Sequence, residues 1–247
     1  MKNLIATACL LLAVIVAKSQ KDDKFFSFDK DFKTVDMKKA EYFVRIRKLA
    51  EKEFEVITYR TFGPRVSREI VEDERAQVRI GECSYYHPTG YLDSIGSFKS
   101  EVQNGEWWFF NKEGRRIRKK NYENGILTKD SVINVEAQAL KVKADPVPGE
   151  VESTFKNGSI GWMRYLNANF RYPQRAESNR IQGMVIIDFI IDEKGKVLSP
   201  EISKSTEYSV DEETLRLIRE SAGWVPASKD GVPLKSYKRQ PITFKLN

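Results

Sequence analysis

The chain has 247 residues, of which 42 are lysine or arginine and 35 are aspartate or glutamate, so its formal net charge is +7. Its hydrophobic fraction of 40% and aromatic fraction of 11% are ordinary for a soluble globular protein, and its length fits one or two domains with a sizeable core. The charges are mixed in sign along the chain instead of blocked, which argues against nucleic acid as a partner.

Residues 1–19 have the pattern of a secretory signal peptide. Lys2 gives a positive start, residues 4–17 form an apolar run, and residues 17–19 fit a cleavage site between small side chains. The run is shorter than the ~20 residues that span a bilayer. We therefore expect cleavage and a periplasmic protein, with an uncleaved inner-membrane anchor as the alternative.

A break in regular structure is expected in the middle of the chain. Residues 143–149 contain two prolines and a closing glycine, which interrupt helices and strands alike. We place a domain boundary there, with an N-terminal region at 20–149 and a second domain at 150–247.

Near the start of the chain, residues 21–32 show no clear element, whereas residues 53–61 have a strand-like pattern.

Residues 81–125 contain an internal repeat with an offset of 24 residues. Each unit has an aromatic strand, a turn with glycine and a second strand that ends in an aromatic residue, which predicts one β-hairpin per repeat. Stacked hairpins would form a sheet, and Asn124-Gly125 would close the array. The matching positions are Gly81-Glu82 with Gly105-Glu106, Tyr85-Tyr86 with Phe109-Phe110, Gly90 with Gly114, and Phe98 with Tyr122.

This repeat resembles the MORN-like repeats of the YwqK-type antitoxin family. The best match is Gly105-Glu106-Trp107, followed by Phe110 and Gly114. Trp107 and Trp108 fall on opposite faces of their predicted strand. Packing of the sheet is the expected role of both, and an exposed aromatic recognition surface is the alternative.

The second domain is organised around an apolar strand at residues 183–192. Every second residue from Val185 to Ile191 is apolar, and the residues between them are apolar except Asp188, which predicts a strand buried on both sides. A turn with a glycine leads to a partner strand at 197–202. The sequence thus predicts that the first two strands of this domain's sheet form an antiparallel pair.

Helices are expected before and after this strand pair, and a third strand closes the chain. Residues 159–169 predict a short helix, and residues 209–222 predict an amphipathic one. Residues 242–246 alternate apolar with polar side chains, as in a half-buried strand. In the second helix, the expected capping box is Ser209 with Glu212, the apolar stripe is Leu215, Ile218 and Ala222, and the stop is Gly223.

Several short motifs follow one another in the last third of the chain. They are Tyr172-Pro173, Ala176, Gln182-Gly183, the apolar strand, Asp192 to Gly195, Asp211-Glu212, Trp224-Val225-Pro226, Gly231-Val232-Pro233 and Phe244-Lys245-Leu246. Their order and spacing resemble the C-terminal domain of TonB-type energy transducers in its Bacteroidetes-like form. The resemblance implies an α+β fold in which helices pack on a small antiparallel sheet, here preceded by the hairpin sheet.

In that family the last strand offers an open edge, and a short extended segment of an outer-membrane transporter pairs with it. The resemblance therefore implies a periplasmic protein that binds such transporters. Family transducers also carry an uncleaved anchor that couples to a proton-driven motor, so a motor complex is implied only if the leader is retained. A structural or adapter protein of the envelope is the alternative function, and a homodimer is left open.

The closing strand is the predicted partner-binding site. Proline is tolerated in a sheet only at a strand start or an edge, so Pro241 predicts an outermost strand. We expect the apolar side chains to point inward and the backbone groups of Gln240, Thr243 and Lys245 to be among those that face a visiting strand. The predicted site residues are Tyr237, Lys238, Arg239, Gln240, Pro241, Ile242, Thr243, Phe244 and Lys245.

No catalytic or metal-binding constellation is expected. His87 is the single histidine and Cys83 the single cysteine after the leader, but without a third orienting group this pair favours structural roles. Glu212 and Glu213 open a helix and do not form a carboxylate pair for acid–base chemistry. We predict a binding protein that is not an enzyme and that needs no cofactor and no metal.

Overall fold

The computed structural model describes residues 23–76, 78–135 and 149–246. The chain divides into two compact units, Met1–Val135 and Glu136–Asn247, and each is described by itself. The predicted leader and residues 143–148 of the predicted break lie outside the described residues, so the leader and the domain boundary stay predictions. No helix within the described ranges is long and apolar enough to cross a membrane.

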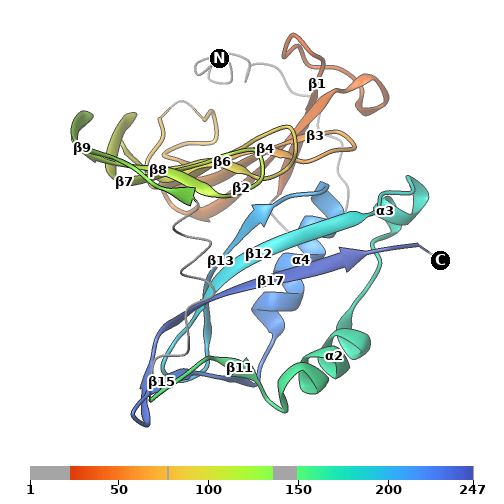
Figure 1. Cartoon of the computed structure of the whole chain (residues 1–247). Helices are drawn as coiled ribbons and strands as arrows, with labels where there is room; N and C mark the ends of the chain where they lie inside the picture. The colour runs from red at the N-terminus through yellow and green to blue at the C-terminus, as the bar shows by residue number, and fades with distance from the viewer. Residues whose placement is uncertain (1–22, 77, 136–148, 247) are drawn as a thin grey trace. The chain divides into compact units, whose positions relative to one another are not determined.

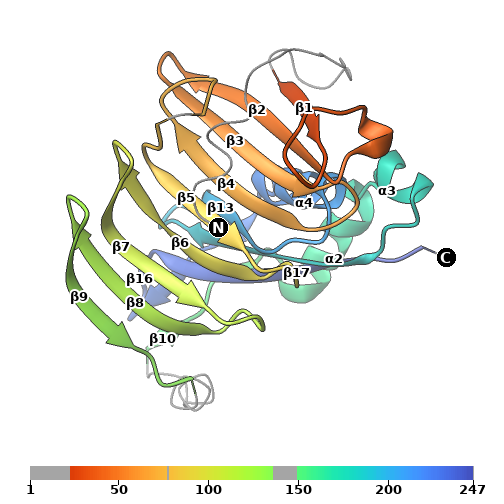
Figure 2. The same ribbon diagram turned by 90° about the horizontal axis from the view of Figure 1, so that it is seen from above.

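The first unit is built on one nine-stranded antiparallel sheet in which each strand pairs with the next in the sequence (Figure 2). A short 3₁₀ helix, η2 (Met37–Lys39), follows the first strand. The strands are β1 (Lys24–Phe28), β2 (Tyr42–Ala50), β3 (Glu53–Arg60), β4 (Arg65–Val71), β5 (Glu82–Tyr86), β6 (Leu92–Lys99), β7 (Val102–Phe110), β8 (Arg116–Glu123) and β9 (Ile126–Val132).

The predicted hairpins are present as β5 with β6 and β7 with β8. They do not end the array, because Asn124-Gly125 is a turn into β9, which pairs with β8. The expectation that this turn closes the array is therefore wrong. Residues 21–32, which show no clear pattern, contain β1, and its pairing with β2 is a long-range contact that no local period reveals. The MORN-like identity of the repeat stays a prediction.

The two tryptophans of β7 differ in their surroundings. Trp107 is only 2% exposed, and its indole nitrogen donates a 3.1 Å hydrogen bond to the carbonyl of Ser97. Gly96 lies beneath its ring, so close that a Cβ there would come within 2.3 Å of it. Trp108 is half-buried, with the cations of Arg116 and Lys119 4.7 and 4.9 Å from its ring centroid. Packing thus accounts for Trp107.

The second unit is α+β, with three helices and three small sheets in its described part (Figure 1). The main sheet has the order β13-β12-β17, and two smaller sheets have the orders β10-β15-β16 and β11-β14. The elements are β10 (Glu150–Val151), β11 (Thr154–Phe155), α2 (Gly158–Asn169), α3 (Gln174–Ser178), β12 (Gly183–Ile191), β13 (Val197–Lys204), α4 (Tyr208–Glu220), β14 (Trp224–Val225), β15 (Ala227–Lys229), β16 (Val232–Leu234) and β17 (Ser236–Phe244).

The core of the second unit lies between α4 and one face of the main sheet. Val185, Ile187, Phe189 and Ile191 of β12 are at most 1% exposed, and Leu217 of α4 is fully buried. The residues between them on β12 are only half-buried. The prediction of a strand buried on both sides is therefore half right, because among the described elements helix α4 packs on β12 and β13 from one face of this sheet (Figure 1).

Helix α4 begins earlier than its sequence predicts. Its N-cap is the buried Glu207, whose carboxylate accepts the backbone N–H of Ser209 at 2.7 Å and binds Arg175 of α3 at 2.6 Å. The predicted capping box of Ser209 with Glu212 is wrong, because tertiary contact with α3 supplies the cap. The helix ends at Glu220, so the exposed Ala222 is not on its apolar stripe.

Candidate partner-binding edge

Strand β17 lies at one edge of the main sheet. It pairs with β12 in a regular register of nine residue pairs, from Gly183 with Phe244 to Ile191 with Ser236. Within the part of the chain that the structure describes, no strand pairs with its other side. An edge strand leaves a row of backbone donors and acceptors open to another chain.

The backbone groups that face the open side of β17 follow from the pairing of β12. The carbonyls of Met184 and Ile186 accept hydrogen bonds from Thr206 and Ser203, so they point to β13. Because the N–H and C=O of successive strand residues point to opposite sides, Val185 and Ile187 point to β17. Their partners on β17, Ile242 and Gln240, then point back to β12.

The odd-numbered residues of β17 therefore face the open edge with their backbone groups. Tyr237, Arg239 and Thr243 are in this set, and Lys245 continues it after the strand. Pro241 is also in this set, so its missing N–H leaves the pairing with β12 intact. The expectation for Gln240 does not hold in this register, because its backbone groups point to β12.

The side chains of β17 alternate between the two faces of the sheet. Tyr237, Arg239, Pro241, Thr243 and Lys245 are exposed, as expected of the solvent face. On the α4 face, Ile242 is 3% and Phe244 1% exposed, whereas Lys238 and Gln240 are partly buried. The predicted site residues thus lie on one continuous strand, with the apolar pair as its anchor.

Aromatic side chains from the segment between α2 and α3 hold the end of β17. The ring centroids of Phe170 and Tyr172 lie 5.0 and 5.8 Å from that of Phe244. The hydroxyl of Tyr172 donates a 2.5 Å hydrogen bond to the carbonyl of Ile181, just before β12. Sequence reasoning did not assign these two aromatics to the site, although their period-two spacing is a signal of a shared face.

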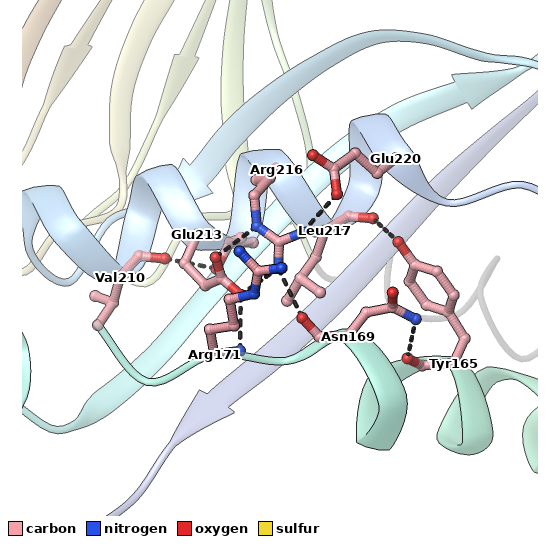
Figure 3. Close-up of polar contacts among 9 residues, drawn as sticks. Tyr165, Asn169, Arg171, Val210, Glu213, Arg216, Leu217 and Glu220 are labelled. Atoms are coloured by element: carbon pink, nitrogen blue, oxygen red, sulfur yellow. Dashed lines mark hydrogen bonds and ion pairs between the residues drawn. The ribbon is translucent and has the colours of Figure 1, made fainter. Parts of the chain in front are cut away.

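That segment is bound to α4 by Arg216 (Figure 3). The guanidinium donates to both carboxylate oxygens of Glu213 at 2.8 and 2.7 Å, and to the carbonyl of Asn169 at 2.7 Å. The same Glu213 accepts the backbone N–H of Arg171 at 2.9 Å. The hydrogen bond to Glu213 raises the pKa of Arg216 above its usual range, so the guanidinium stays charged. Spacings of three and four residues to Glu213 and Glu220 are the sequence signal for this network.

One ion pair lies on the solvent face of the edge. Arg239 donates to both carboxylate oxygens of Asp188, its neighbour on β12, at 2.7 Å each. This bidentate pair raises the pKa of Arg239 and links the edge strand to the sheet. The ammonium of Lys238 donates instead to the carbonyl of Ser153 at 2.8 Å.

His87 contacts a backbone carbonyl and a carboxylate, and Cys83 is buried. The imidazole Nε2 lies 3.0 Å from the carbonyl of Phe110, in the next repeat, and 3.4 Å from a carboxylate oxygen of Asp93. Burial raises the pKa of the Cys83 thiol to about 12, which suppresses the nucleophilic thiolate. In the described ranges, no cluster of three or more acidic, histidine or cysteine side chains could hold a metal ion.

Comparison with known proteins finds a similarity in the last third of the chain. Residues 168–246 match the family of the Gram-negative bacterial TonB protein C-terminal. This family is transport-associated, non-enzymatic and from the Gram-negative envelope, and it implies interaction with outer-membrane transporters. The solution structure of the TonB C-terminal domain of Helicobacter pylori is similar at 22% identity and a TM-score of 0.28, covering 34% of this chain and 77% of that one. No curated protein matches the chain.

Proposed function

We propose that this chain is a periplasmic TonB-like protein that binds outer-membrane transporters by strand addition at β17. The observation that supports the proposal is the open edge, on which Tyr237, Arg239, Thr243 and Lys245 present their backbone groups. Pro241 lies in the same row and offers only its carbonyl. A short extended segment of a transporter would hydrogen-bond to these groups and continue the β13-β12-β17 sheet. Coupling to a proton-driven motor is part of the proposal only if the leader is retained.

The decisive experiment replaces Thr243 by proline. Its N–H faces the open edge, so the variant should stay folded and lose one donor to the partner. A net hydrogen bond contributes about 0.5–1.5 kcal/mol, and more if a buried acceptor is orphaned, so affinity for a transporter-derived peptide should fall roughly tenfold. Fluorescence titration of the full chain with peptides that copy periplasmic segments of outer-membrane transporters measures this.

Two matched variants control that experiment. Thr243→Val keeps the backbone donor and should bind as the parent does. Gln240→Pro removes a donor that faces β12, so circular dichroism should show loss of folded structure in the second unit. If Thr243→Pro is folded and binds as tightly as the parent, the site at β17 is wrong. A structural or adapter role in the envelope then becomes the better reading.

A further inference from the structure

The edge formed by β17 and its flanking residues is positively charged, and this charge bears on the chemistry of the partner. Residues 231–246 contain four lysines and arginines and no aspartate or glutamate. Arg239 and Lys245 fall in the exposed odd-numbered row, together with Tyr237, which is 54% exposed, and the exposed Lys235 comes directly before the strand. At about 3.4 Å per residue, ten residues separate the two lysines by up to roughly 34 Å, so they flank the open edge at its opposite ends.

Among the residues that the structure describes, most of this positive charge has no ion-pair partner. Arg239 is bound to Asp188, whereas Lys238 donates to an uncharged carbonyl. Within the described ranges, no salt bridge joins Lys235 or Lys245 to a carboxylate. The acidic side chains of this sheet lie further from the open side, since Asp188 is on β12 and its neighbour Glu201 is on β13.

We infer that the segment that pairs with β17 is acidic, with a carboxylate near each end of the paired stretch. This inference rests on the proposed strand addition at β17 and adds the partner's charge to it. Backbone hydrogen bonds accept almost any sequence, so the flanking lysines would favour partners with aspartate or glutamate at the matching positions. Repulsion from the same lysines would disfavour basic segments.

The test uses the full chain and three synthetic peptides of about eleven residues, so that their two ends are as far apart as Lys235 and Lys245. Each peptide alternates threonine with valine and differs only at its two ends, which carry glutamate, glutamine or lysine. An exposed ion pair contributes up to about 1 kcal/mol, so the glutamate peptide should bind about three- to tenfold more tightly than the glutamine peptide at low salt. At about 1 M salt, where the screening length is about 3 Å, the difference should disappear.

Charge variants of the protein complete the test. The double variant Lys235→Gln with Lys245→Gln should bind the glutamate and glutamine peptides equally. Arg219→Gln, which changes an exposed residue of α4, should keep the preference.

The possible results separate this inference from the proposed function. Equal binding of the glutamate and glutamine peptides to the parent would overturn the charge inference and leave strand addition standing. Binding of none of the three to a folded parent would reject strand addition and the inference with it. If the double lysine variant still prefers the glutamate peptide, groups other than Lys235 and Lys245 cause the preference, which also overturns the inference.

Discussion

At the scale of single residues, Gly96 lets the ring of Trp107 lie against the backbone of the first unit's sheet. Gly96 is on β6, and Trp107 is on the neighbouring strand β7. Three ring atoms of Trp107 lie 2.3 to 2.5 Å from the place where a Cβ at position 96 would be. Glycine is therefore the residue that lets the indole lie flat over the neighbouring strand.

Gly96→Ala should consequently destabilise the first unit. The added methyl group forces the ring or the strand to move, and such overpacking typically costs about 1–3 kcal/mol. Urea unfolding followed by tryptophan fluorescence measures the change. Ser97→Ala, which alters the next residue and keeps the carbonyl that Trp107 binds, is the matched control and should have a smaller effect. Equal stability of Gly96→Ala and the parent would show that the indole is not confined there.

At the scale of elements, Arg216 connects α4 to the segment that supports the edge strand. Its contacts with Asn169 and Glu213 hold the backbone on which Phe170 and Tyr172 stand, and these rings pack on Phe244. The network therefore links α4 to the end of β17 through the aromatic contacts. Its removal should affect the edge without a direct contact between Arg216 and that strand.

Arg216→Ala should destabilise the second unit by about 1–3 kcal/mol, because it leaves the largely buried Glu213 carboxylate without its cation. Hydrogen exchange should become faster at residues 169–172 and at residues 242–244. Arg219→Ala, an exposed neighbour on the same helix, should change neither measurement. If exchange rises in the 169–172 segment and not in β17, the aromatic link to the edge is too weak to matter.

At the scale of the whole molecule, the two units are expected to be separable. The second unit begins with β10 and β11, which pair with β15 and β14. Phe155 of β11 also packs against Trp162 and Trp224, at 5.3 and 5.1 Å between ring centroids. These contacts protect the backbone from about residue 150 onward, so the accessible cleavage sites between the units should precede that point.

Limited proteolysis of the full chain should therefore release a C-terminal fragment that begins near Gly149 and resists further digestion. Two unfolding transitions should accompany it, since each unit has its own core. Mass spectrometry identifies the fragment, and calorimetry counts the transitions. A single cooperative transition, with no protected fragment, would contradict the independence of the units and the predicted boundary near Gly149.

Local patterns in the sequence were enough to find many of the regular elements, although not β1 or β9. The period-two run around Val185, the glycine turns of the repeat and the closing alternation after Pro241 each depend on residues close together in the chain. The edge position of β17 was predicted from Pro241, which a strand start or an edge tolerates, together with the resemblance to the TonB C-terminal domain. Those features predicted the hairpins and the main strands of the second unit, whereas the partner-binding role of the closing strand came from the family resemblance.

The tertiary structure decided what depends on residues distant in sequence. Arg175 binds the carboxylate of Glu207, which is the N-cap of α4, so the helix begins before Ser209. Arg175 is distant in the sequence, and no capping pattern near Ser209 reveals this contact. The backbone groups of Gln240 point to β12 and not to the open edge, and this direction depends on how β12 pairs with β13. Burial distinguished Trp107 from Trp108 in the same way. Periodicity determines which side chains share a face, whereas only long-range pairing determines which face and which edge remain open.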